Sequence, residues 1–264
     1  MERSLRKPFQ GVLNIIRFNW HFYVVALLLI TLLLVFTFLK PSVYNLYLYL
    51  FIAAAILGTS LSLLASYYIY DISNLYSLKW LDDLKIQKNA FILNINAGFD
   101  ETSTLLKSKY PDAKLKALDF YNPFKHTEVS IERARKAYPA FPGTELIDTA
   151  KINLALNNVD CIFLILAAHE IRDKKEQITF FEQLKSTLKI EGKIVVVEHN
   201  RDFYNFLVYN FGCFHFFSPK RWTTVFKDAG LKLTQTKKIT PFINVLIRLF
   251  NALLTQGDYY SGFK

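Results

Sequence analysis

The sequence predicts an α/β domain, built on a mostly parallel sheet, that follows a hairpin of two membrane-spanning helices. From residue 91 onward, short apolar runs alternate with polar helical stretches, a pattern typical of βαβ units. Residues 159–199 show this most clearly, because they read as strand, loop, helix, turn and strand. Nearer the N-terminus, Trp20–Leu39 and residues 43–70 contain no Asp, Glu, Lys or Arg. Each can cross a hydrocarbon core, which takes about 20 apolar residues.

The distribution of basic residues orients the predicted hairpin. The chain has 264 residues, a net charge of +10 and 52% hydrophobic residues, which suits a membrane surface as readily as nucleic acid. Four basic residues precede the first helix, whereas Lys40 stands alone in the connecting loop. By the positive-inside rule, the N-terminus and the α/β domain therefore lie in the cytosol, and we expect a multi-pass protein of the cytoplasmic membrane. The four basic residues are Arg3, Arg6, Lys7 and Arg17.

The predicted elements divide the chain into three parts. Residues 1–70 hold a basic segment and two helices (about 20–39 and 43–66), residues 71–88 a juxtamembrane connector or lid, and residues 89–264 the α/β domain. Glu191 and Gly192 are expected to turn the chain before the fifth strand. Apolar runs predict strands at 91–95, 115–118, 145–147, 161–167, 194–197, 231–239 and 242–250. Helical spacing predicts helices at 101–110, 128–138, 174–188 and 222–229.

The unit at residues 159–199 resembles the fourth and fifth strands of class I methyltransferases, which use S-adenosylmethionine. The resemblance includes Leu188, Lys189 and Gly192 before the fifth strand. Residues 119–144 resemble a bacterial, membrane-anchored subgroup of these proteins. The resemblance implies a Rossmann-like sheet of seven mostly parallel strands that closes with a C-terminal antiparallel hairpin. It also implies S-adenosylmethionine as the cofactor and methyl transfer as the reaction.

The turn after the first strand departs from the family pattern, which places an acid and a series of glycines there. Gly98 matches the central glycine, and Asn94 stands where the acid is usual. Asn96 and Asp100 replace two further glycines. Asn tolerates left-handed backbone, so Asn96 is expected to preserve the turn. Asp100 either binds the cofactor's amino group or marks a site that has lost the cofactor.

Acidic residues at the ends of the second and third strands complete the predicted cofactor site. Asp119 ends the second strand about 20 residues after the turn, where a carboxylate accepts hydrogen bonds from ribose hydroxyls. Asp148 and Thr149 end the third strand, where the family often places an acid near the adenine amino group. The predicted cofactor-binding residues are Asn94, Asn96, Gly98, Asp119, Phe120, Asp148 and Thr149.

The predicted catalytic residues follow the fourth and fifth strands. His169 and Glu170 follow the fourth strand and His199 the fifth, and histidine is the usual general base near neutral pH. Residues 203–217 are dense in aromatics, which suits either a pocket for an apolar substrate or a helix docked on the membrane. The charged residues after the fourth and fifth strands (Arg172, Glu198, Arg201 and Asp202) could instead form a structural ion-pair network. The predicted substrate-binding residues are Arg172, Arg201, Asn205 and His215.

Together these features predict a membrane-anchored methyltransferase that acts on a lipophilic or aromatic small molecule or a lipid at the cytosolic face. The alternative is a catalytically inactive, membrane-tethered binding or scaffold protein. The basic residues are scattered, which argues against nucleic acid as a partner, and Arg133 and Arg135 are expected on a solvated face. Cys161 and Cys213 show no metal-ligand spacing, so no metal site is expected. The acceptor atom and the oligomeric state stay open.

Overall fold

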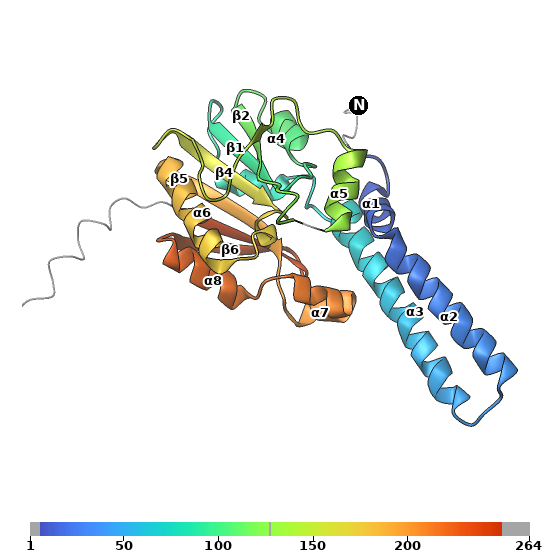
Figure 1. Ribbon diagram of the computed structural model, residues 1–264. Helices are drawn as coiled ribbons and strands as arrows, with labels where there is room; N and C mark the ends of the chain where they lie inside the picture. The colour runs from blue at the N-terminus through green and yellow to red at the C-terminus, as the bar shows by residue number, and fades with distance from the viewer. Residues whose placement is uncertain (1–5, 127, 250–264) are drawn as a thin grey trace, which may run out of the picture.

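The computed structural model describes residues 6–126 and 128–249, which include a single seven-stranded sheet of order β3-β2-β1-β4-β5-β7-β6 (Figure 1). β1 pairs in parallel with β2 and β4, and β4 pairs in parallel with β5. β7 runs antiparallel to both β5 and β6. This is the strand order of the class I methyltransferase fold, so the predicted fold is confirmed. The strands are β1 (Phe91–Asn96), β2 (Lys114–Asp119), β3 (Glu145–Leu146), β4 (Val159–Ile165), β5 (Leu188–His199), β6 (Lys232–Thr240) and β7 (Ile243–Leu249).

Two apolar layers cover the sheet. On one face, Phe180, Phe181 and Leu184 of α6 pack with Trp222 and Phe226 of α8. On the other face, Leu106 of α4 packs with buried side chains from residues 69–84. The helices of this domain are α4 (Ser103–Lys109), α5 (Val129–Ala137), α6 (Lys174–Thr187), α7 (Phe203–Tyr209) and α8 (Pro219–Asp228), with short 3-10 turns η3 (Ala168–Glu170) and η4 (Asn210–His215).

The fifth strand differs from its prediction. Glu191 and Gly192 were expected to form a turn before the fifth strand. They lie within the strand instead, because β5 already begins at Leu188. The pairing shifts from Val159↔Leu188 to Cys161↔Lys193, so the extra residues bulge out of the ladder. Glu191 has a φ of 65°, which accommodates this bulge. The carboxyl end of β5 is unaffected and still places His199 at the edge of the sheet.

Two long helices leave the domain as an antiparallel hairpin (Figure 1). They are α2 (Trp20–Leu39) and α3 (Asn45–Tyr67), and α3 continues through the π-helix η1 (Tyr68–Ile72). Trp20–Leu39 and Asn45–Ile72 are long and apolar enough to cross a membrane, by length and composition. Only 6% and 11% of their apolar windows are buried, so neither helix serves as a core helix of the α/β domain.

The segment between the hairpin and β1 packs under the sheet. Its apolar side chains belong to the core layer that contacts β1, β4 and β5. The short 3-10 helix η2 (Lys79–Leu84) contributes three of them. The segment therefore stands where a helix would cover this face, and it ties the hairpin to the domain. The buried apolar side chains are Leu75, Leu78, Trp80, Leu81 and Leu84.

Candidate active site

A cavity of about 240 Å³ lies at the carboxyl ends of β1, β4 and β5. It is called the main cavity below because residues that follow three of the central strands line it. Its walls come from the loop after β1, from η3 after β4 and from His199 at the end of β5. The strand order reverses between β1 and β4, and α/β sheets bind ligands at such a switch point. The helix α1 (Gln10–Phe18) closes the cavity from the hairpin side, with Asn14 and Phe18 among the lining residues.

The turn after β1 keeps its shape without the missing glycines. Gly98 has a φ of 100°, a region that favours glycine. The Gly98 amide donates to the side-chain oxygen of Asn96 at 2.9 Å, and the Asn96 amide group donates to the carbonyl of Leu118 at 3.2 Å. Asn96 therefore closes the turn and ties it to β2. Asn96 also lines the main cavity, where a cofactor-binding residue is expected.

Asp100 organises the start of α4. Its Oδ1 accepts from the backbone amides of Thr102 and Ser103 at 3.0 and 2.9 Å. Asn94 donates to the hydroxyls of Thr102 and Ser103 at 2.9 and 2.8 Å. Asn94 is buried below the cavity and is not among its lining residues. These two departures from the family pattern thus form one local network that holds the helix, because an oxygen at this position satisfies otherwise unpaired amides.

Asp119 ends β2 as predicted, but an arginine holds its carboxylate. Arg135 of α5 donates to Asp119 Oδ2 at 2.5 Å and to the carbonyl of Gly98 at 3.2 Å. Its guanidinium also stacks over the Tyr121 ring, 4.4 Å from the centroid. The expectation of a solvated face for Arg133 and Arg135 is therefore wrong. Arg133 also points inward, where it donates to the Phe18 carbonyl at 2.6 Å.

The remaining predicted cofactor residues line a second cavity, of about 250 Å³. Phe120, Asp148 and Thr149 contribute to its wall, next to Tyr121. Arg135 contacts Gly98, beside the main cavity, and Tyr121, in the wall of the second. The arginine side chain thus lies between the two cavities.

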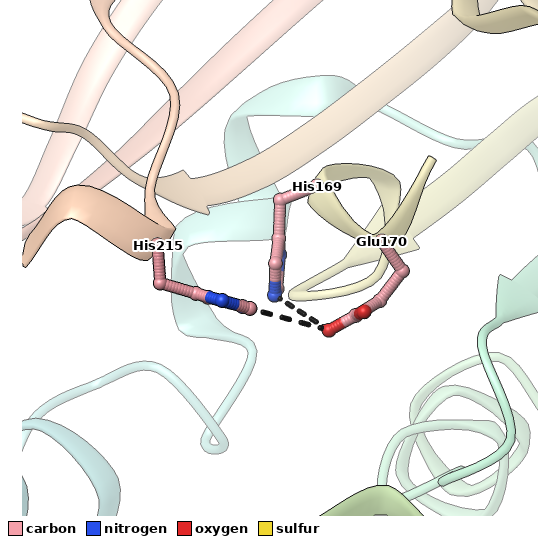
Figure 2. A group of neighbouring side chains, drawn as sticks. All are labelled: His169, Glu170 and His215. Atoms are coloured by element: carbon pink, nitrogen blue, oxygen red, sulfur yellow. Dashed lines mark ion pairs between the residues drawn. The ribbon is translucent and has the colours of Figure 1, made fainter. Parts of the chain in front are cut away.

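His169 and Glu170 of η3 lie next to His215 of η4 in the wall of the main cavity (Figure 2). His169 Nδ1 lies 2.7 Å from Glu198 Oε2, and His169 Nε2 lies 3.0 Å from Glu170 Oε1. His215 Nε2 lies 3.7 Å from the same Glu170 oxygen, and His215 Nδ1 lies 3.0 Å from Glu128. Three carboxylates therefore surround two imidazoles.

The carboxylates determine the charge of this cluster. Burial alone would lower the pKa of His169, but Glu198 and Glu170 outweigh it and raise the pKa to about 10. Burial would likewise lower the pKa of His215, and its hydrogen bonds to Glu128 and Glu170 raise it. Burial alone would raise the pKa of Glu170, and both histidines lower it. The carboxylates on both sides of the His169 ring therefore favour its charged form, and its role as a general base stays a prediction.

His199 is the uncharged histidine of the site. Burial lowers its pKa to about 3, with the nearby charges of His169 and His215 acting in the same direction. Its Nδ1–H donates to Asn205 Oδ1 at 3.1 Å, and its Nε2 accepts from the Tyr70 hydroxyl at 2.9 Å. Tyr70 lies in η1, at the base of the hairpin, so the helix that leaves the domain holds a residue of the cavity wall.

The predicted substrate-binding residues separate in the structure. His215 lines the main cavity, and Arg172 contacts its ring and its carbonyl from the solvent side. Asn205 is fully buried behind His199 and also donates to the Phe242 carbonyl at 3.1 Å. Arg201 is exposed, and its backbone amide donates to the Phe217 carbonyl at 2.9 Å. Of these four residues, His215 alone lines the cavity, and Arg172 lies directly behind it.

Several residues of the cavity and its surroundings were not singled out from the sequence. Glu101 accepts from Arg6 at 2.7 Å and from the Tyr76 hydroxyl at 2.6 Å, and both partners are distant along the chain. Asp71 accepts from the amides of Gly11 and Val12 at 2.7 and 2.8 Å and so anchors the start of α1. The apolar periodicity of residues 10–18 was the available signal for α1, but it does not reveal that this helix covers the site.

Solved methyltransferases share the architecture at low sequence identity. A SAM-dependent methyltransferase from Aquifex aeolicus aligns with a TM-score of 0.49 at 16% identity, over 73% of this chain and 97% of that one. One from Methanosarcina mazei aligns with a TM-score of 0.49 at 14% identity, over 65% and 97%. Human N-acetylserotonin methyltransferase in complex with SAM aligns with a TM-score of 0.48 at 16% identity, over 72% and 55%. No family model and no curated protein matches the sequence.

Proposed function

We propose that this chain, which has the class I methyltransferase sheet, is a membrane-anchored methyltransferase that uses S-adenosylmethionine. The observation that carries the proposal is the cavity at the switch point of the sheet, with Gly98 in its tight turn and Asp119 at the end of β2. The cavity residues after β1, β4 and β5 come from three different strands, so the sheet itself brings them together.

The residues present fit the cofactor once Arg135 moves. Asp119 would hold the ribose hydroxyls, the Gly98 turn would lie against the methionine part, and Phe120, Asp148 and Thr149 would surround the adenine in the second cavity. Moving the Arg135 side chain away from Gly98 and Tyr121 would join the two cavities. Bound S-adenosylmethionine supplies an electrophilic methyl group. The chain must then place a nucleophile against it.

His169, Glu170 and Glu198 form the acceptor side of the site in this proposal. Glu198 is fully buried and holds His169 by its ring and by its backbone amide at 3.1 Å, which fixes the ring in place. Glu170 presents a carboxylate at the cavity wall. A hydroxyl or amine of the acceptor would donate to Glu170, and its proton would pass to the Glu170 oxygen that does not face the two histidines.

The surroundings of the cavity suit a lipophilic acceptor. The hairpin would anchor the chain in the cytoplasmic membrane with the α/β domain on the cytosolic side, following its basic N-terminal residues. α7 packs against α3 beside the hairpin (Figure 1). The exposed apolar residues of α7 and η4 are Phe203, Tyr204, Phe206, Leu207, Phe211 and Phe214. Aromatic and aliphatic side chains such as these partition into the membrane interface.

Methyl transfer itself tests the proposed function. The full chain in lipid nanodiscs is incubated with S-adenosylmethionine labelled in the methyl group and with lipid extract from the native organism. We expect label in the organic phase with the wild type and a loss of at least tenfold in Glu170→Gln, because the amide no longer accepts a proton. Label that stays in the aqueous phase would point to a polar acceptor and contradict the lipophilic assignment.

The ion pair between Arg135 and Asp119 favours a second candidate, an inactive tethered binding protein. Arg135 satisfies the carboxylate that the cofactor would need. In a protein that no longer binds the cofactor, this ion pair would stay formed. A folded wild type that does not bind S-adenosylmethionine, in the presence or absence of lipid, would favour this candidate.

A further inference from the structure

We propose that His169, Glu170 and His215 form a binding site for one divalent transition-metal ion, with Zn²⁺ as the expected occupant. The site lies in the wall of the main cavity, but the proposal does not depend on methyl transfer. It rests on three features of the cluster: the spacing of the ligand atoms, the carboxylates behind both histidines, and the separate elements that bring the ligands together.

The ligand atoms are spaced as the ligands of one ion are spaced. One atom from each of the three residues lies within 4.8 Å of the other two. The Glu170 Oε1 atom is 3.0 Å from His169 Nε2 and 3.7 Å from His215 Nε2. Two ligands that each lie about 2.1 Å from a metal ion are separated by about 3.0 to 3.5 Å. The Glu170–His215 separation exceeds this range, and the three atoms lie within 4.8 Å of one another, so the His215 ring would have to move toward the other two ligands to bind the same ion.

The outer nitrogen of each histidine faces a carboxylate. His169 Nδ1 lies 2.7 Å from Glu198, and His215 Nδ1 lies 3.0 Å from Glu128. Metal-binding histidines almost always donate their second ring nitrogen in this way, which orients the ring and increases its basicity. His169 Nε2 points at Glu170 Oε1 (Figure 2), and His215 Nε2 lies 3.7 Å from the same oxygen.

Separate elements of the fold hold the ligands and their carboxylates. His169 and Glu170 belong to η3, His215 to η4, and Glu198 to the buried end of β5. Glu128 directly precedes α5. The packing of these elements around the central sheet brings the ligand atoms together. The three ligands lie on short 3-10 turns, and Glu198 on the central sheet holds one of them, His169, in place.

The donor set selects the kind of metal. Two imidazoles and one carboxylate are the protein ligands of open zinc sites, which keep a further position for water or substrate. The same set suits Fe²⁺, Co²⁺ and Ni²⁺, whereas Mg²⁺ and Ca²⁺ prefer oxygen ligands. The cavity side of the cluster is where the open position would lie.

Arg172 is the competing cation in the structure. Its guanidinium contacts both ring nitrogens of His215, Nδ1 most closely and Nε2 at 2.8 Å, and it pairs with Glu128 at 3.5 Å. Its side chain is 41% exposed, so it can turn toward solvent when an ion takes its place at the ring. Loss of this arginine should therefore strengthen metal binding, whereas a purely structural ion-pair network would predict no metal binding at all.

Metal titration of the full chain tests the proposal without the cofactor. The protein is purified in detergent through a tag without histidines, stripped with a chelator and titrated calorimetrically with Zn²⁺. We expect one ion per chain, a loss of affinity of at least tenfold in His215→Ala, and roughly 10- to 100-fold weaker binding in Glu198→Gln. His21→Gln, at the base of the hairpin, is the matched histidine control and should bind as the wild type does.

Two further measurements keep the result unambiguous. Circular dichroism melting curves establish that each variant is folded, and the visible spectrum of bound Co²⁺ reports directly on ligation by imidazole. Arg172→Gln should bind Zn²⁺ more tightly than the wild type. A folded wild type that binds no Zn²⁺, or equal binding in the wild type and His215→Ala, would overturn the proposal. Weaker binding in Arg172→Gln than in the wild type would contradict the role given to that arginine.

Discussion

Arg135 and Asp119 are joined by a hydrogen bond of 2.5 Å at the end of β2, where the cofactor ribose would otherwise meet the carboxylate. Asp119 is buried, and the arginine is the group that covers it. A bound ribose would compete with Arg135 for Oδ2, whereas Oδ1 accepts from the Tyr121 backbone amide at 2.8 Å. Under the proposed function, the strength of that competition determines how tightly the chain would bind S-adenosylmethionine.

Removal of the arginine should therefore strengthen cofactor binding. We expect Arg135→Gln to bind S-adenosylmethionine at least tenfold more tightly than the wild type, because a charge-assisted hydrogen bond no longer has to be broken. Lys136→Gln, on the exposed side of the same helix, is the control and should leave the affinity unchanged. Calorimetric titration measures both. Weaker binding in Arg135→Gln would show instead that the arginine helps to hold the cofactor.

Alanine substitutions at two glycines with positive φ distinguish the cost of backbone strain from the cost of a steric clash. Gly143 has a φ of 78°, and a side-chain carbon added there would meet no atom within 4 Å, so Gly143→Ala should cost only about 1 kcal/mol of unfolding free energy. In Gly98→Ala the new carbon would lie 2.9 Å from Arg135 and 3.0 Å from Tyr121. We expect a larger loss of stability and a loss of cofactor binding there. Equal effects of the two substitutions in thermal unfolding and titration would contradict the close packing at Gly98.

Asp100 stands where the methyltransferase pattern has a glycine, and its substitution tests whether the carboxylate serves helix stability or cofactor binding. Its carboxylate accepts from two amides at the start of α4, so Asp100→Ala should lower the unfolding free energy by about 1 kcal/mol. The affinity for S-adenosylmethionine should not change, since the carboxylate is engaged with the helix. Asp112→Ala, in an exposed turn, is the control for the loss of one charge. A specific loss of cofactor affinity in Asp100→Ala would restore a direct role for Asp100 in cofactor binding.

His199 makes stability depend on pH. Its pKa is about 3 in the folded chain and about 6.5 when unfolded, so the folded state favours the uncharged ring. Stability is fully present above pH 6.5 and falls by up to about 1.4 kcal/mol per pH unit as the pH drops toward 3. The neighbouring His169 and His215, whose pKa values are raised by their carboxylate partners, stay charged over this range in the folded chain. Chemical unfolding of wild type and His199→Gln across this range should show a shallower decline in the variant, and parallel curves would refute the assignment.

The central strands were predictable because both of their faces are buried. A parallel strand such as β4 is apolar where both faces are buried, and its residues 161–165 are therefore visible in the sequence as one run. The carboxyl end of each strand follows from the run, which is why His169, Glu170 and Asp119 were found. The bulge in β5 was not predicted, since Glu191 and Gly192 are as typical of a turn as of a bulge.

Contacts between distant segments were the part that the sequence did not reveal. Arg135 was expected on a solvated face because a single arginine on a polar helix carries no sign of its partner. The pairs Arg6–Glu101 and Tyr70–His199 join residues that are 95 and 129 positions apart, so only the folded chain brings them together. The catalytic roles of His169, Glu170 and His199 stay predictions.

Titration of S-adenosylmethionine into the detergent-purified full chain, with Asp119→Asn alongside, tests the central claim most directly. The variant keeps the shape of the side chain but removes the charge that would hold the ribose hydroxyls. We predict binding of one cofactor per chain by the wild type and a loss of at least tenfold in Asp119→Asn. The absence of binding by a wild type that melts cooperatively, even with Arg135→Gln introduced, would contradict the proposed function and leave a tethered binding protein.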